Sequence, residues 1–186
     1  MRVLVIHPYD PSTQFLRVLY ENSLAEYVIM NESNSNSEIR NALNSGEYNR
    51  IMMLGHGTEW GLLSPNCRGS QNMFERDIIS PQHVQFLRNI ECIGIWCNAN
   101  IFAERYELSG LFSGMVISEL SEAMEFNIAA SEDEIMSHRT QWANNLNECI
   151  SQNWENLSEV PDAMMNHLSE NHTYLEEFNY ESIFYF

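Results

Sequence analysis

The sequence contains no lysine. All nine of its basic residues are arginines, against 26 acidic residues, and the formal net charge is −17 at pH 7. A chain this acidic is excluded as a general nucleic-acid binder, because binding phosphates requires a basic surface. Cationic partners or substrates suit it better. The missing lysine has two open explanations: drift, or selection against lysine, either to escape amine-directed modification or to resist self-cleavage by a lysine-directed activity.

Cysteines and long apolar runs are also scarce. The cysteines are Cys67, Cys92, Cys97 and Cys149, too few for a disulfide scaffold. Residues 1–6 form a short apolar run without the layout of a cleavable signal. No stretch approaches eighteen consecutive apolar residues, which excludes a membrane-spanning helix. We therefore expect a cytoplasmic protein in a reducing environment, with no membrane partner.

Apolar segments of strand length alternate with segments of helical periodicity. Strands are predicted at residues 2–7, 27–30, 50–56 and 91–97, with shorter ones at 60–64 and 126–130. Helices are predicted at 14–24, at 37–46 with Ser37 as N-cap, and at 81–87, 109–124, 133–153 and 161–168. The aromatic end, 182–186, predicts either an edge strand or a docking tail. This alternation predicts one α/β domain over 1–186, a doubly wound three-layer sandwich with a mostly parallel sheet.

Three residues with reactive side chains end predicted strands. They are His7, His56 and Cys97, and parallel sheets bind ligands at the carboxyl ends of their strands. If the strands that carry His56 and Cys97 are neighbours, the two side chains face one another across the edge of the sheet. Gly55 and Gly57 flank the histidine, giving the backbone freedom to turn and a substrate room to approach.

The segments "IMMLGHG" and "ECIGIWC" carry a family resemblance. Each is an apolar strand ending in a reactive residue, His-Gly in the first and Cys in the second, with His56 and Cys97 41 positions apart. In this order they resemble the clan CD cysteine peptidases, which include caspases, gingipains, separases and CHAT-type peptidases. Residues 109–134 are similar to the CHAT and gingipain layout of a small-residue helix, a fifth strand and an acidic loop. The resemblance covers residues 1–155, leaves the tail 156–186 unassigned, and implies a caspase-like (flavodoxin-like) fold.

The resemblance implies a cysteine endopeptidase that acts on a protein or peptide substrate without cofactor or metal. Cys97 would be the nucleophile and His56 the general acid and base. The oxyanion would be held by the backbone N–H groups of Gly57 and Cys97. His7 ends the strand that lines the P1 pocket in the family. The alternative for Cys97 is a small buried residue at a strand end, as free cysteines often are.

Substrate preference is less well defined by the sequence. Basic-specific relatives often carry Asp two positions before the nucleophile, and that position here is Ile95. Asp10, Glu132 and Asp133 are the acidic residues expected near the edge of the sheet, and carboxylates there would favour a basic P1 residue. The alternative for the latter two is that they stabilise a helix N-terminus behind the N-cap Ser131.

Two other functions stay open. The chain is short for a peptidase of this clan, so part of the substrate groove would be missing or would be supplied by a partner protein. A catalytically inactive caspase-like module that binds a protein through its acidic face or aromatic tail is the main alternative. The third is another hydrolase that uses the same pair of residues, although no Gly-x-Ser-x-Gly, P-loop or Gly-x-Gly-x-x-Gly motif supports it.

Overall fold

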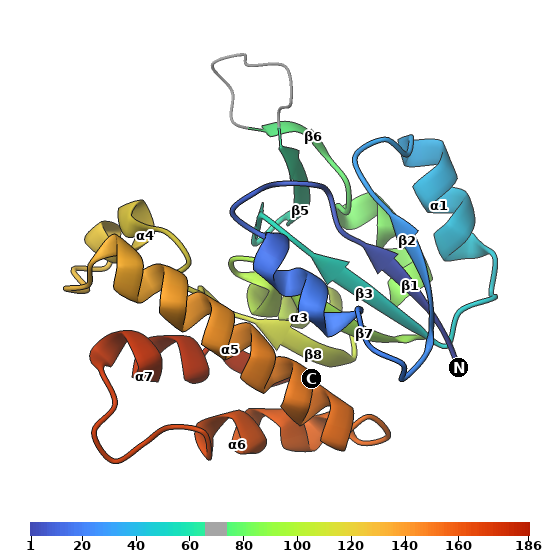
Figure 1. Ribbon diagram of the computed structural model, residues 1–186. Helices are drawn as coiled ribbons and strands as arrows, with labels where there is room; N and C mark the ends of the chain where they lie inside the picture. Colours follow the sequence, from blue (N-terminus) through green and yellow to red (C-terminus); the bar gives the residue numbers. More distant parts are fainter. Residues whose placement is uncertain (66–73) are drawn as a thin grey trace.

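The protein has an α/β fold built on a six-stranded, mostly parallel sheet (Figure 1). The computed structural model describes residues 1–65 and 74–186. The strands lie in the order β2-β1-β3-β7-β8-β9, and every neighbouring pair is parallel except β8 and β9. Their bounds are β1 (Arg2–Ile6), β2 (Glu26–Met30), β3 (Arg50–Leu54), β7 (Glu91–Ile95), β8 (Gly110–Ser113) and β9 (Ile183–Tyr185). The predicted mostly parallel sheet is confirmed.

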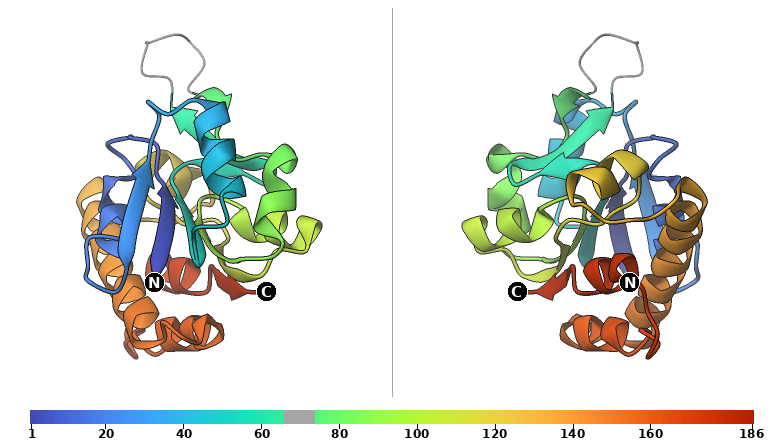
Figure 2. Two further views of the ribbon diagram at one scale, coloured as in Figure 1. Left: turned by 90° about the vertical axis from the view of Figure 1, so that its right-hand side faces the viewer. Right: turned by 90° about the vertical axis from the view of Figure 1, so that its left-hand side faces the viewer.

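Helices cover both faces of this sheet (Figure 2). One face carries η1 (Gln14–Leu19), α5 (Glu132–Gln152), η3 (Leu157–Glu159), α6 (Val160–Met165) and α7 (Tyr174–Tyr180). The other carries α1 (Asn36–Asn44), η2 (Pro81–His83), α2 (Val84–Leu87) and α3 (Ala99–Tyr106). A short helix, α4 (Leu120–Glu125), lies beside the N-terminal end of α5. A small antiparallel sheet of β4 (Gly57–Thr58), β5 (Gly61–Pro65) and β6 (Phe74–Asp77) follows β3.

The alternating direction of the side chains along each strand explains why helices cover both faces of the sheet. In β1, Val3 and Val5 point into the core formed with α5, whereas Leu4 and Ile6 point into the core formed with α1, α2 and α3. All four side chains are fully buried. Successive side chains of a strand face opposite sides, so a strand that is apolar at every position requires a packed layer on each side. The three layers follow from this pattern.

The helix predicted over residues 109–124 is wrong. The segment starts as β8, continues as a loop and reaches helical conformation only in α4. Its small residues serve close packing between strands rather than between helices: Gly110 has φ +131°, and a Cβ there would lie 2.0 Å from the carbonyl oxygen of Cys92. Leu111 and Phe112 then point into opposite cores.

The strand predicted at 126–130 is also wrong, because the place beside β8 is taken by the C-terminal segment. β9 pairs antiparallel with β8, so the aromatic end is an edge strand of the main sheet. Residues 126–130 form a turn in which Asn127 has φ +56°, and Ile128 packs into a small cluster with Ile135 of α5.

The helix predicted from Ser37 is capped two residues earlier, by Ser35, which accepts a hydrogen bond from the backbone N–H of Glu38.

Candidate functional site

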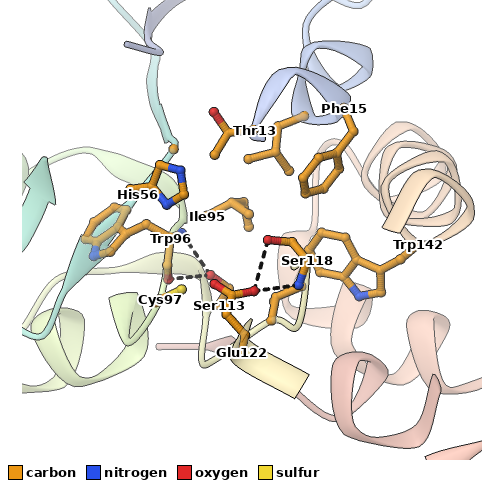
Figure 3. Close-up of a pocket in the computed structure, with 13 residues that line it drawn as sticks. Thr13, Phe15, His56, Ile95, Trp96, Cys97, Ser113, Ser118, Glu122 and Trp142 are labelled. Atoms are coloured by element: carbon orange, nitrogen blue, oxygen red, sulfur yellow. Dashed lines mark hydrogen bonds between the residues drawn. The ribbon is translucent and has the colours of Figure 1, made fainter. Parts of the chain in front are cut away.

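His56 and Cys97 lie at the same edge of the central sheet, because each follows one of two neighbouring parallel strands. Leu54, the last residue of β3, pairs with Ile95, the last residue of β7. His56 and Cys97 each lie two residues beyond that pair. The backbone N–H of Gly55 still donates to the carbonyl of Ile95 at 3.0 Å, which holds the strand ends together. Both side chains line one pocket (Figure 3).

The two glycines around His56 are required for different reasons. Gly55 has φ +138°, a conformation that L side chains rarely adopt, and it turns the chain out of β3. Gly57 has a φ outside that region, but a Cβ there would lie 2.0 Å from Cδ1 of Trp96 and 2.6 Å from the carbonyl oxygen of Gly61. Trp96 is buried, and its Nε1 donates to the carbonyl of Thr58 at 3.0 Å. Gly57 therefore lets the β4–β5 hairpin pack directly on the residue before Cys97.

His56 is held by two side chains from the segment after β1. Its Nε2 lies 2.7 Å from Oγ of Ser12 and 3.6 Å from Oδ1 of Asp10. Ser12 donates its hydroxyl proton to Asp10 at 2.6 Å, so its oxygen accepts the proton carried by Nε2 of His56.

Asp10 stays ionised in this arrangement. Partial burial alone would raise its pKa, but the hydrogen bonds from the hydroxyl and backbone N–H of Ser12, together with His56, bring the pKa below the ordinary value. Sequence reasoning placed Asp10 near the edge of the sheet but did not find Ser12 or their link to His56. The available signal was position: both follow β1, the strand beside β3.

Cys97 is half-buried and its thiol is protonated at neutral pH. Burial raises its pKa to about 12, and the nearby carboxylate of Glu122 adds to the increase. A hydrogen bond from the backbone N–H of Val116 acts in the opposite direction but does not offset the rise. Because the thiolate is the nucleophilic form, this thiol requires a base or a bound cation before it reacts.

Ser113, the last residue of β8, fixes the backbone that carries Cys97. Its hydroxyl accepts from the backbone N–H of Trp96 at 3.0 Å and donates to the carbonyl of the same residue at 2.8 Å. Asn98 follows in a left-handed conformation, φ +65°, and its N–H donates to the carbonyl of Gly114 at 3.2 Å. The end of β7 is thus attached at two points to the β8 segment. Ser113 was not singled out from the sequence, because a serine in a misassigned helix gives no such signal.

The pocket that contains His56 and Cys97 is narrow and mainly apolar. It encloses about 360 Å³ including its open mouth. Its apolar walls are formed by Phe15, Leu16, Ile95, Val116 and Trp142. Ser118 and Glu122 line it from the α4 side (Figure 3).

The other residues predicted to bind substrate do not line this pocket. His7 is buried, with its Nδ1 3.0 Å from the hydroxyl of Tyr20, and burial lowers its pKa to about 4. Glu132 and Asp133 are exposed in the first turn of α5, where Ser131 is the N-cap. Their position agrees with the helix-capping alternative.

The remaining cysteines lie away from the pocket. Cys92 and Cys149 are buried in the two main cores, and Cys67 falls outside the described residues.

Among residues 1–65 and 74–186, no group of three or more His, Cys, Asp or Glu side chains is arranged to hold a metal ion. None of the helices in those two ranges is both long and apolar enough to cross a bilayer. No protein-family model and no curated protein sequence matches the chain.

Proposed function

We propose that the protein is a cysteine endopeptidase of the caspase-like type, with His56 and Cys97 as its catalytic pair. One observation carries the proposal: the imidazole and the thiol follow the paired ends of two adjacent parallel strands and line the same pocket. The likeness of "IMMLGHG" and "ECIGIWC" to clan CD peptidases supports the same assignment, and so does the three-layer arrangement. Enzymes that use a nucleophile and a base require this proximity.

The proposed reaction follows from these positions. As Sγ of Cys97 bonds to the scissile carbonyl carbon, the thiol proton passes to the imidazole of His56. Backbone N–H groups, with Gly57 and Cys97 as the candidates, stabilise the oxyanion. The C–N bond breaks when His56 returns the proton to the leaving amine. Water then hydrolyses the thioester, which releases a carboxylic acid and restores the thiol.

A second function is favoured by the state of Cys97. A thiol with a pKa of about 12, in a pocket this narrow, suits a protein-binding module that has the fold without the reaction. Labelling with a peptidyl acyloxymethyl ketone separates the two functions, because this reagent requires a nucleophilic cysteine placed beside a bound peptide.

For an active peptidase we expect labelling at Cys97, measured by peptide mass spectrometry in a Cys67→Ser background. Labelling should disappear in His56→Ala, whereas the same variant should keep its folded structure by circular dichroism. An unlabelled Cys97 in the parent protein would support the binding module, and labelling that persists in His56→Ala would contradict the catalytic pair.

Ser12 is proposed as a positioning residue that fixes the orientation of the His56 ring. We expect Ser12→Ala to lower kcat about 10- to 100-fold with KM nearly unchanged, because a small displacement of a catalytic group costs rate rather than binding. Ser12→Thr retains the hydroxyl and should restore most of the activity. Equal loss in the alanine and threonine variants, or a loss confined to KM, would show that the hydrogen bond to Nε2 has no positioning role.

A further inference from the structure

Glu122 is the one carboxylate among the described residues that line the pocket of Cys97. It reaches the pocket from α4, and its charge is close enough to Cys97 to raise the pKa of the thiol. The surrounding walls are apolar, including Phe15, Val116 and Trp142. A pocket with apolar sides and a single negative charge complements a side chain that has a methylene stem and a cationic end.

The two oxygens of this carboxylate are not equivalent. Oε2 accepts hydrogen bonds from the backbone N–H of Ser118 at 2.7 Å, from its hydroxyl at 3.1 Å, and from the backbone N–H of Glu119 at 3.0 Å. Oε1 takes none of these bonds. The local structure therefore fixes the carboxylate through Oε2.

We propose that this pocket binds a lysine side chain of the substrate, with Oε1 of Glu122 as the partner of its ammonium group. The proposal rests on the peptidase function and specifies its substrate. Lysine fits better than arginine, because an ammonium is a point charge that one oxygen can bind, whereas a guanidinium binds best to both oxygens of a carboxylate at once.

The composition of the chain points in the same direction. It contains nine arginines and no lysine, so a peptidase that cleaves after lysine would find no such site in its own sequence. A bound ammonium would also offset the negative field of Glu122 at Cys97, which favours the thiolate when the correct substrate is present. Recognition and activation would then depend on the same carboxylate.

The test compares matched peptides that differ at one side chain: lysine against norleucine, and arginine against citrulline, in an alanine-rich peptide. For the parent enzyme we expect kcat/KM to be roughly 10- to 100-fold higher for lysine than for norleucine, the size expected for a hydrogen bond to a charged group. Glu122→Gln should abolish this ratio. Gln still completes the hydrogen bonds at the start of α4, so the loop should stay in place.

Glu132→Gln is the matched control, since its carboxylate belongs to the neighbouring surface and does not line this pocket. It should leave the lysine-to-norleucine ratio within about twofold. A higher kcat/KM for arginine than for lysine would overturn the lysine assignment. A ratio that survives Glu122→Gln would overturn the role of Glu122.

A binding measurement separates this proposal from the peptidase function. Cys97→Ser cannot form the thioester, so fluorescence anisotropy with the same labelled peptides reports recognition alone. Tighter binding of the lysine peptide, lost when Glu122→Gln is added, would support the pocket even if the parent enzyme hydrolyses nothing. Hydrolysis without any preference for lysine would support the peptidase function and refute the lysine-binding pocket. If no peptide is hydrolysed and all four bind equally, both the peptidase function and the lysine-binding pocket are refuted.

Discussion

Replacing Cys97 with serine is expected to lower peptide hydrolysis at least about a thousandfold. The sulfur atom provides a nucleophile that His56 can deprotonate, whereas a serine hydroxyl in the same position is far less acidic. The measurement is kcat/KM on a lysine-containing peptide, with product quantified by mass spectrometry. Cys67→Ser is the control for loss of a thiol and should keep the parent rate.

His56→Ala is expected to cause a loss of similar size, because general acid and base catalysis contributes about 10²- to 10⁴-fold. The double variant Cys97→Ser with His56→Ala should be little worse than either single variant, since two residues that act in one step give non-additive effects. The unfolding free energies of both single variants should stay within about 1 kcal/mol of the parent, because neither side chain is part of a main core. Activity in either single variant close to that of the parent would refute the catalytic pair.

The position of the candidate pair was predictable because it depends on short-range patterns. Each of the strands β3 and β7 is an almost continuous apolar run. The run of β3 ends at Gly55 and His56, and that of β7 ends at Cys97 and Asn98, so the sequence itself places His56 and Cys97 near the edge of the sheet. That the two strands are neighbours was only a condition at that stage, and the pairing of Leu54 with Ile95 confirms it.

The rest of the pocket was not predictable, because it depends on contacts between distant segments. Ser12 reaches His56 only because β1 lies next to β3 in space, and Glu122 reaches Cys97 only because β8 is a strand rather than a helix. β8 has four residues, two of them small, which resemble the small-residue pattern of a packed helix. Its partner β9 comes from the end of the chain: Ser113 of β8 pairs with Ile183 of β9. No pattern in the sequence near β8 could predict a pairing with so distant a segment.

Gly57→Ala is expected to lower the free energy of unfolding by about 2 to 3 kcal/mol. The added methyl group would lie 2.0 Å from Cδ1 of Trp96. Trp96 is buried and packs edge-on against Phe102 and Phe112, so moving the indole aside would disrupt these contacts. Activity should fall as well, because Trp96 precedes Cys97 and any shift of the indole displaces the nucleophile. Chemical denaturation monitored by tryptophan fluorescence measures the first effect.

Gly46→Ala separates this packing effect from loss of glycine's conformational freedom. Gly46 has φ +71° but no atom within 4 Å of an added Cβ, so its replacement should cost only about 1 kcal/mol of backbone strain.

Trp96→Leu combined with Gly57→Ala should recover part of the lost stability, because the leucine side chain is smaller, which makes the two changes non-additive. If Gly57→Ala unfolds at the parent denaturant concentration yet still loses activity, the hairpin does not depend on this close contact, and the glycine serves the substrate instead. A stability loss that Trp96→Leu partly relieves would instead assign Gly57 to the packing that holds Cys97 in place.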